Sequence, residues 1–174
     1  MELTFEIITL SVLIALSGFF SGLEVALVGV TRSKVNQMLS KKLPGANSLH
    51  KLKSNPSRMM ASVNLGNNLV NVASTALATN IALKIFENNG LAIVIGAMTF
   101  LILVFGEITP KTYCNANAAK IALRYSRVLL AFSYAFYPVV WIFEQITKGI
   151  IKLTGSSQEP PRLTEEEIKG VIEQ

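Results

Sequence analysis

Apolar residues gather along the chain in three long runs, and each run is interrupted by one short polar segment. The first run covers about residues 3–30, with Glu6 and Glu24 as its only charged residues. The second covers about 59–83 and the third about 88–108. A helix crosses a bilayer core with roughly 20 residues, and all three runs reach that length. The pattern therefore predicts an all-α membrane protein with three transmembrane helices.

A fourth apolar stretch, at about 128–153, has a different character. It contains Pro138, is rich in aromatic residues, and becomes charged after Phe143. Aromatic side chains favour the membrane–water interface, and an amphipathic helix can lie along it. We expect a juxtamembrane helix at the cytoplasmic face. A fourth span is the alternative, and it would place the C-terminal tail outside.

The last part of the chain is predicted to leave the membrane. The segment GSSQEPPR has the Gly, Ser and Pro content of a linker. Thr164 and Glu167 then form a capping box, which starts a new polar helix. We expect residues 1–154 to form a transmembrane domain, and residues 155–174 to be a linker and the start of a truncated cytosolic region.

Basic residues predict the orientation of the spans. The segment between the first and second runs has no acidic residue and seven basic ones: Arg32, Lys34, Lys41, Lys42, Lys51, Lys53 and Arg58. Such loops face the cytoplasm by the positive-inside rule. We therefore expect a multi-pass protein of the cell membrane, with its N-terminus outside and its C-terminus in the cytoplasm.

Composition excludes several kinds of chemistry. No Asp occurs among the 11 acidic residues, which excludes an aspartyl-dyad intramembrane protease. The single cysteine, Cys114, cannot form an intrachain disulfide, and with one histidine, His50, the chain offers no zinc or iron–sulfur cluster. The spans also lack a paired nucleophile and base. We expect no enzyme, and any bound metal should be a hard, oxygen-liking cation.

The polar interruptions of the three spans fall at similar depth. They are SGFFSG at 17–22, followed by Glu24; NLGNN at 64–68, followed by Asn71; and GEITP at 106–110. Because successive spans run in opposite directions, these positions correspond to one level in the cytoplasmic half of the membrane. The glycines and Pro110 are expected to unwind the helices and free main-chain carbonyls.

Oxygen atoms in these segments suit a hard cation. The candidate ligands are the hydroxyl of Ser21, the amide oxygens of Asn67 and Asn71, a carbonyl near Gly106 and the carboxylate of Glu107. Mg²⁺ and Ca²⁺ accept such ligands, and Mg²⁺ asks for six in near-octahedral order. Na⁺ could use the same groups.

Other polar or small residues of the spans have structural explanations. Gly18 and Gly22 form a small-xxx-small pattern, for which close helix packing is preferred. Asn64, Asn68 and Asn80 are expected to hydrogen-bond neighbouring helices. Glu24 could be protonated or paired with Arg32, or it could assist the ion site, and these alternatives stay open.

Three motifs, SGFFSGLEVAL, GNNLVNVASTALAT and FGEITPKTYC, resemble in order and spacing the transmembrane domain of the CorC/CNNM family of magnesium transporters. The resemblance covers essentially the whole chain. It implies a homodimer with three spans and a juxtamembrane helix in each protomer, and a dehydrated Mg²⁺ in an inward-facing cavity. Export would be driven by Na⁺. The positions that match the family's ion site are Ser21, Asn67, Asn71, Gly106 and Glu107, and Thr109 and Pro110 match the rest of the third motif.

The same resemblance implies what lies beyond the membrane domain. In the family, an acidic start such as TEEEI leads into paired CBS domains, which bind ATP and Mg²⁺ and regulate export. We therefore expect ATP only through that missing region, and we expect no nucleic-acid partner. The expected function is Mg²⁺ export by a homodimer in the lipid bilayer. The alternative is a Mg²⁺-sensing membrane scaffold that regulates another transporter and conducts nothing.

Overall fold

Helices make up nearly all of the residues that the computed structural model describes, which are 2–85 and 91–153. Their order is α1 (Glu2–Gly29), α2 (Arg32–Ser40), α3 (Ala46–Ser54), α4 (Pro56–Ile85), α5 (Leu91–Leu101), the π-helix η2 (Ile102–Ile108), α6 (Thr109–Ala116), α7 (Ala118–Ala135) and α8 (Tyr137–Leu153). No strand occurs in these two ranges. The predicted all-α fold class is confirmed. The linker and acidic segment expected at 155–174 lie outside the described residues.

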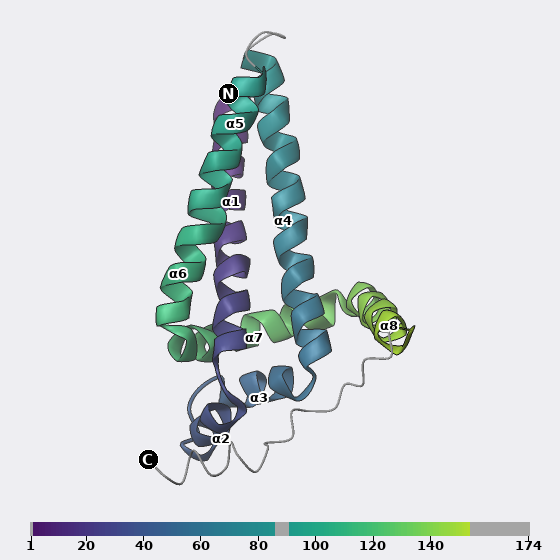
Figure 1. Cartoon of the computed structure of the whole chain (residues 1–174). Coiled ribbons are helices and arrows are strands. Elements are labelled where there is room, and N and C mark those ends of the chain that lie inside the picture. Colours follow the sequence, from purple (N-terminus) through teal and green to yellow (C-terminus); the bar gives the residue numbers. More distant parts are fainter. Residues whose placement is uncertain (1, 86–90, 154–174) are drawn as a thin grey trace, which may run out of the picture.

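Three long helical columns stand side by side, and they are α1, α4 and the α5–η2–α6 run (Figure 1). The segments Leu3–Gly29 and Ile95–Ala116 are long and apolar enough to cross a membrane. Helix α4 has 30 residues and is therefore about 45 Å long at 1.5 Å per residue. It is not among the helices that are apolar enough to cross a membrane by composition. Part of its surface is exposed, with Val72 70% exposed. The three columns coincide in position with the three predicted spans, and the membrane crossing of α4 stays a prediction.

The stretch 128–153 is divided between two helices. Helix α7 lies crosswise at one end of the columns, and α8 leaves it at a bend of 88° (Figure 1). Pro138 is the second residue of α8, where its missing N–H leaves no helical hydrogen bond unmade. The pair would count as a further span only if it were one broken helix. The crosswise direction of α7 and the bend favour the expected juxtamembrane position over the alternative of a straight fourth span.

Glycines bring the columns into close contact at the level of the predicted site. A Cβ atom at Gly22 would lie 2.5 Å from the Cys114 sulfur, and one at Gly18 would lie 2.9 Å from Cγ of Pro110. On the other side of α1, a Cβ at Gly66 of α4 would overlap the ring of Phe20. A side chain at any of these positions would force a neighbouring group to move. The predicted packing role of Gly18 and Gly22 is confirmed.

Only one of the three polar segments departs from α-helical geometry. Helix α1 is continuous through 17–22, and α4 is continuous through 64–68. The expected unwinding of these two helices does not occur, because their glycines serve close packing, which a regular helix allows. The third segment does depart from α-helical geometry, since Gly106 and Glu107 belong to the π-helix η2.

Candidate cation site

A single hydroxyl group joins the three polar segments. Ser17 Oγ donates a hydrogen bond to Oδ1 of Asn71 at 2.5 Å and lies 3.3 Å from the carbonyl oxygen of Gly106. Ser17 belongs to α1, Asn71 to α4 and Gly106 to η2, and the Ser17 side chain is 1% exposed. The three segments therefore meet at one level, as their positions in the sequence predict.

The carbonyl of Gly106 is available because of the proline four residues later. In a regular α-helix the N–H of residue 110 would bond to this carbonyl, but Pro110 has no N–H. The N–H of Thr109 bonds to the carbonyl of Val104, five residues back, which is the π-helical pattern. Gly106 also leaves room for its partner, since a Cβ there would lie 2.9 Å from Ser17 Oγ. The sequence GEITP thus presents a main-chain oxygen to Ser17.

Two buried oxygen atoms one helical turn away have no hydrogen-bond partner in the part of the chain that the structure describes. They are Oγ of Ser21 and Oδ1 of Asn67. Helices α1 and α4 run in opposite directions, so four residues after Ser17 on α1 correspond to four residues before Asn71 on α4 (Figure 1). Ser21 and Asn67 therefore occupy the same level. Buried polar atoms are nearly always paired, and an unpaired one is costly, so these two oxygens need an explanation.

The carboxylate of Glu107 lies beside a lysine. Its Oε1 is 2.8 Å from Nζ of Lys111, one turn further along, and its side chain is 40% exposed. The same lysine is 3.8 Å from Oε2 of Glu24. The basic residue beside Glu24 is therefore Lys111, and not Arg32 as the sequence suggested. A cavity of about 310 Å³ adjoins Glu24 and Lys111.

Sequence reasoning missed two residues of this region, Ser17 and Lys111. Both follow from the helical period, because Ser17 precedes Ser21 by four residues and Lys111 follows Glu107 by four. Lys111 belongs to the third motif, FGEITPKTYC, but sequence reasoning did not pair it with a glutamate. The structure assigns the lysine to the two glutamates.

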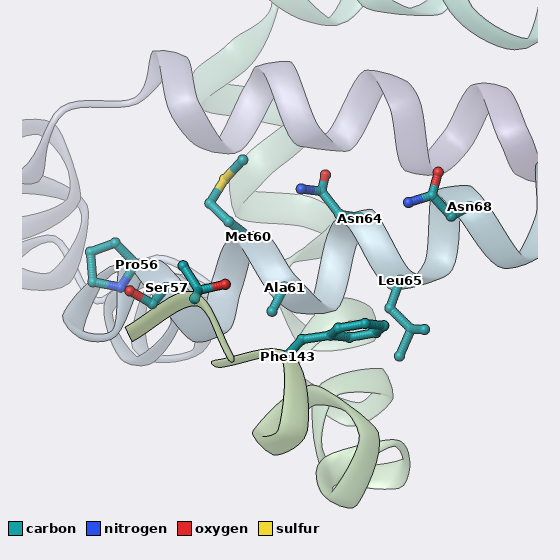
Figure 2. A pocket seen from close by; sticks show the side chains of 9 residues that line it. Pro56, Ser57, Met60, Ala61, Asn64, Leu65, Asn68 and Phe143 are labelled. Atoms are coloured by element: carbon teal, nitrogen blue, oxygen red, sulfur yellow. The ribbon is translucent and has the colours of Figure 1, made fainter. Parts of the chain in front are cut away.

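Two neighbouring asparagines lie on another face of α4. Asn64 and Asn68 are exposed and line a cavity of about 530 Å³ between α4 and α8. Figure 2 shows them on the same side of α4 as Met60, with Phe143 of α8 against the helix. The hydrogen bonds to neighbouring helices expected for Asn64 and Asn68 are not found among residues 2–85 and 91–153. These two amides are separate from the pair Asn67 and Asn71.

The oxygen atoms available as metal ligands favour a hard cation. Within the described ranges no three side chains of His, Cys, Asp or Glu come together. What gathers between α1, α4 and η2 is a set of neutral oxygens, of the hydroxyl, amide and carbonyl types. Mg²⁺, Ca²⁺ and Na⁺ are the ions that such oxygens can hold, whereas zinc and copper prefer nitrogen or sulfur.

Comparison with known proteins identifies the family. The family model described as the Cyclin M transmembrane N-terminal domain matches residues 7–174. A UPF0053 protein of Haemophilus influenzae is 30% identical over 167 residues, covering 95% of this chain and 40% of that protein. The UPF0053 inner membrane protein YfjD of Escherichia coli is 30% identical over 160 residues, or 90% of this chain and 37% of the relative. A DUF21 domain-containing chloroplast protein of Arabidopsis thaliana is 34% identical over 164 residues, with coverages of 94% and 25%.

The matched region is only part of these relatives. The chain spans 40%, 37% and 25% of their lengths in turn, while nearly all of the chain is matched. The family match, the helical membrane architecture and the junction of three polar segments all agree. The chain belongs to the CorC/CNNM family, and it carries the transmembrane domain of that family.

Proposed function

We propose that this membrane domain transports Mg²⁺ through a site formed by Ser21, Asn67, Asn71, Gly106 and Glu107. The observation that carries the proposal is the pair of buried, unpartnered oxygens on Ser21 and Asn67, next to the contact of Ser17 with Asn71 and Gly106. These oxygens are electron-rich acceptors that lack a donor. A cation between α1, α4 and η2 would satisfy both of them.

The hydrogen bond from Ser17 is compatible with ion binding by Asn71. An amide or carbonyl oxygen has two lone pairs, so Asn71 Oδ1 can accept from Ser17 and still face a cation. The carbonyl oxygen of Gly106, at 3.3 Å from Ser17 Oγ, also has two lone pairs and can face a cation. In this proposal Ser17 is a positioning residue, since its hydroxyl sets the separation of the two oxygens.

The charges around the site suit transport better than storage. Two carboxylates, Glu24 and Glu107, share one ammonium group, that of Lys111, which leaves one net negative charge. A single negative charge cannot neutralise a divalent ion. We propose that the Glu107 carboxylate exchanges Lys111 for Mg²⁺, and that the incompletely neutralised ion is held loosely enough to leave again.

Direction, coupling and assembly form the finer part of the proposal. The end of the molecule with α2 and α3 has seven basic and no acidic residues over 32–58, which supports a cytoplasmic position for it. The N-terminus would then lie outside and the C-terminus in the cytoplasm. We propose Mg²⁺ export coupled to Na⁺ entry by a homodimer in the cell membrane, without enzymatic activity. Control by ATP would need a CBS region beyond this domain.

Flux measurements in vesicles test the proposal. The purified chain is reconstituted alone into liposomes that contain a Mg²⁺-sensitive dye, and an external Mg²⁺ step is applied with and without an opposing Na⁺ gradient. We expect Mg²⁺ entry well above that of protein-free liposomes, and faster entry when Na⁺ can leave. Mg²⁺ binding by calorimetry without any flux would instead support the sensing scaffold.

A further inference from the structure

Arg58 lies in the first turn of α4, against two aromatic rings that belong to α7 and α8. The centre of its guanidinium group is 5.0 Å from the ring centroid of Tyr134 and 4.7 Å from that of Tyr137. Its Nε donates to the hydroxyl of Ser133 at 3.1 Å. The rings contact the π-face of the cation, and this interaction leaves the N–H groups at its edge to find acceptors elsewhere.

One edge of this guanidinium has no acceptor. Nη2 of Arg58 is buried and makes no hydrogen bond to any of the residues that the structure describes. The carboxylate of Glu144 lies near enough to interact with Arg58 electrostatically, but its Oε1 contacts Lys148 at 2.7 Å and Asn55 at 3.4 Å. A charged donor without an acceptor is costly in a buried place, so Nη2 is expected to meet an anionic group.

Arg58 also lines a pocket. It has a volume of about 230 Å³, which is nearly eight times the ~30 Å³ share of a water molecule. Lys51, Arg58, Ser54, Asn55, Ser133 and Tyr134 supply its polar walls, and Leu52, Met59 and Leu130 its apolar ones. The walls thus combine two cations with hydroxyl and amide groups. This is the composition of a phosphate site with an apolar side.

The surroundings of the pocket are those of a membrane interface. Tyr134, Tyr137 and Trp141 of α7 and α8 are 58%, 47% and 49% exposed, which is typical of an aromatic belt. The neighbouring helices α2 and α3 are strongly basic. Burial, and after it the charge of Arg32, lowers the pKa of Lys53 in α3.

We propose that this pocket, bounded by α3, α4 and α7, binds the phosphate of an anionic phospholipid, with Arg58 and Lys51 as its cationic ligands. The apolar walls and the aromatic belt favour a lipid over a soluble phosphate ester. Basic pockets at the ends of membrane helices are known to recognise anionic head groups in this way. The site is separate from the proposed cation site, since none of its residues belongs to that set.

Native mass spectrometry of the full chain tests the proposal. The protein is titrated in detergent with phosphatidylglycerol, with phosphatidylcholine of the same acyl chains, and with soluble glycerol phosphate. We expect phosphatidylglycerol to bind at least several times more tightly than the other two. The affinity of the Arg58→Gln variant for phosphatidylglycerol should be about tenfold lower than that of the wild type, as expected for the loss of one charge-assisted hydrogen bond. For the exposed Lys51→Gln the fall should be about fivefold, and Lys41→Gln, outside the pocket, should bind as the wild type does.

Each result decides for or against the lipid site. Equal binding of the two phospholipids by the wild type would overturn the proposal, and so would equal losses in Lys51→Gln and Lys41→Gln. Glycerol phosphate binding as tightly as phosphatidylglycerol would overturn the lipid as the source of the phosphate. If Arg58→Gln does not fold, the comparison of the two lysine variants still decides.

Discussion

Replacing Asn71 by Ala should reduce Mg²⁺ flux through the reconstituted protein by about 10-fold to 100-fold, which is the range typical for loss of a group that supports a metal site. The amide oxygen of Asn71 accepts from Ser17 at 2.5 Å, and Ser17 also contacts the carbonyl of Gly106. The substitution therefore removes one proposed ligand. It also leaves the serine without the acceptor that orients it.

A neighbouring amide provides the matched control for Asn71. Asn68 lies three residues earlier on α4 but is exposed and lines the cavity towards α8. Asn68→Ala makes the same chemical change outside the proposed site, so its flux should stay near that of the wild type. Initial rates of Mg²⁺ entry into dye-loaded liposomes, at equal amounts of reconstituted protein, give the comparison. Equal rates for the two variants would remove Asn71 from the site.

The second large effect is expected for Gly106→Ala. The new Cβ would lie 2.9 Å from Oγ and 3.4 Å from Cβ of Ser17, at the contact between η2 and α1. The two helices are already closely packed one turn away, where a Cβ at Gly18 of α1 would lie 2.9 Å from the Pro110 ring. They therefore have little room to move apart locally. Overpacking of this kind costs about 1–3 kcal/mol, so we expect a lower unfolding temperature together with a loss of flux.

Two further variants separate overpacking from other effects of Gly106→Ala. Gly96, in α5, has open space around its Cβ position, so Gly96→Ala should not lower the unfolding temperature. In the double variant Ser17→Ala/Gly106→Ala the 2.9 Å contact with Oγ is absent, and part of the lost stability should return while flux stays low. An unfolding temperature of Gly106→Ala equal to that of Gly96→Ala would show that the contact does not constrain the two helices.

The lengths of the apolar runs and the positions of the motifs were sufficient to predict much of the fold. The three long runs predicted the three columns, and alternating direction predicted that the segments containing Ser17, Asn71 and Gly106 would meet. Pro110 also indicated a break, and a π-helix is found before it. These predictions rest on local chemistry and on chain direction, both of which can be followed residue by residue.

Contacts between side chains were harder to predict. Glu107 was expected to face the other polar segments, but its carboxylate contacts Lys111, because a partner one turn away on the same helix competes with more distant groups. The glycines of 17–22 and 64–68 were expected to unwind α1 and α4, and both helices are continuous. A glycine in a sequence does not distinguish a helix break from a close contact, since the second depends on which side chain lies opposite. For Gly66 that side chain is the ring of Phe20.

The most direct test of the cation site is a high-resolution structure of the protein prepared with Mg²⁺. We expect density for an ion between Oγ of Ser21, Oδ1 of Asn67 and the carbonyl oxygen of Gly106, at oxygen distances of about 2.1 Å. The density should vanish when the protein is prepared with a chelator. A map with Mg²⁺ in which these oxygens face only one another or water would contradict the proposed site.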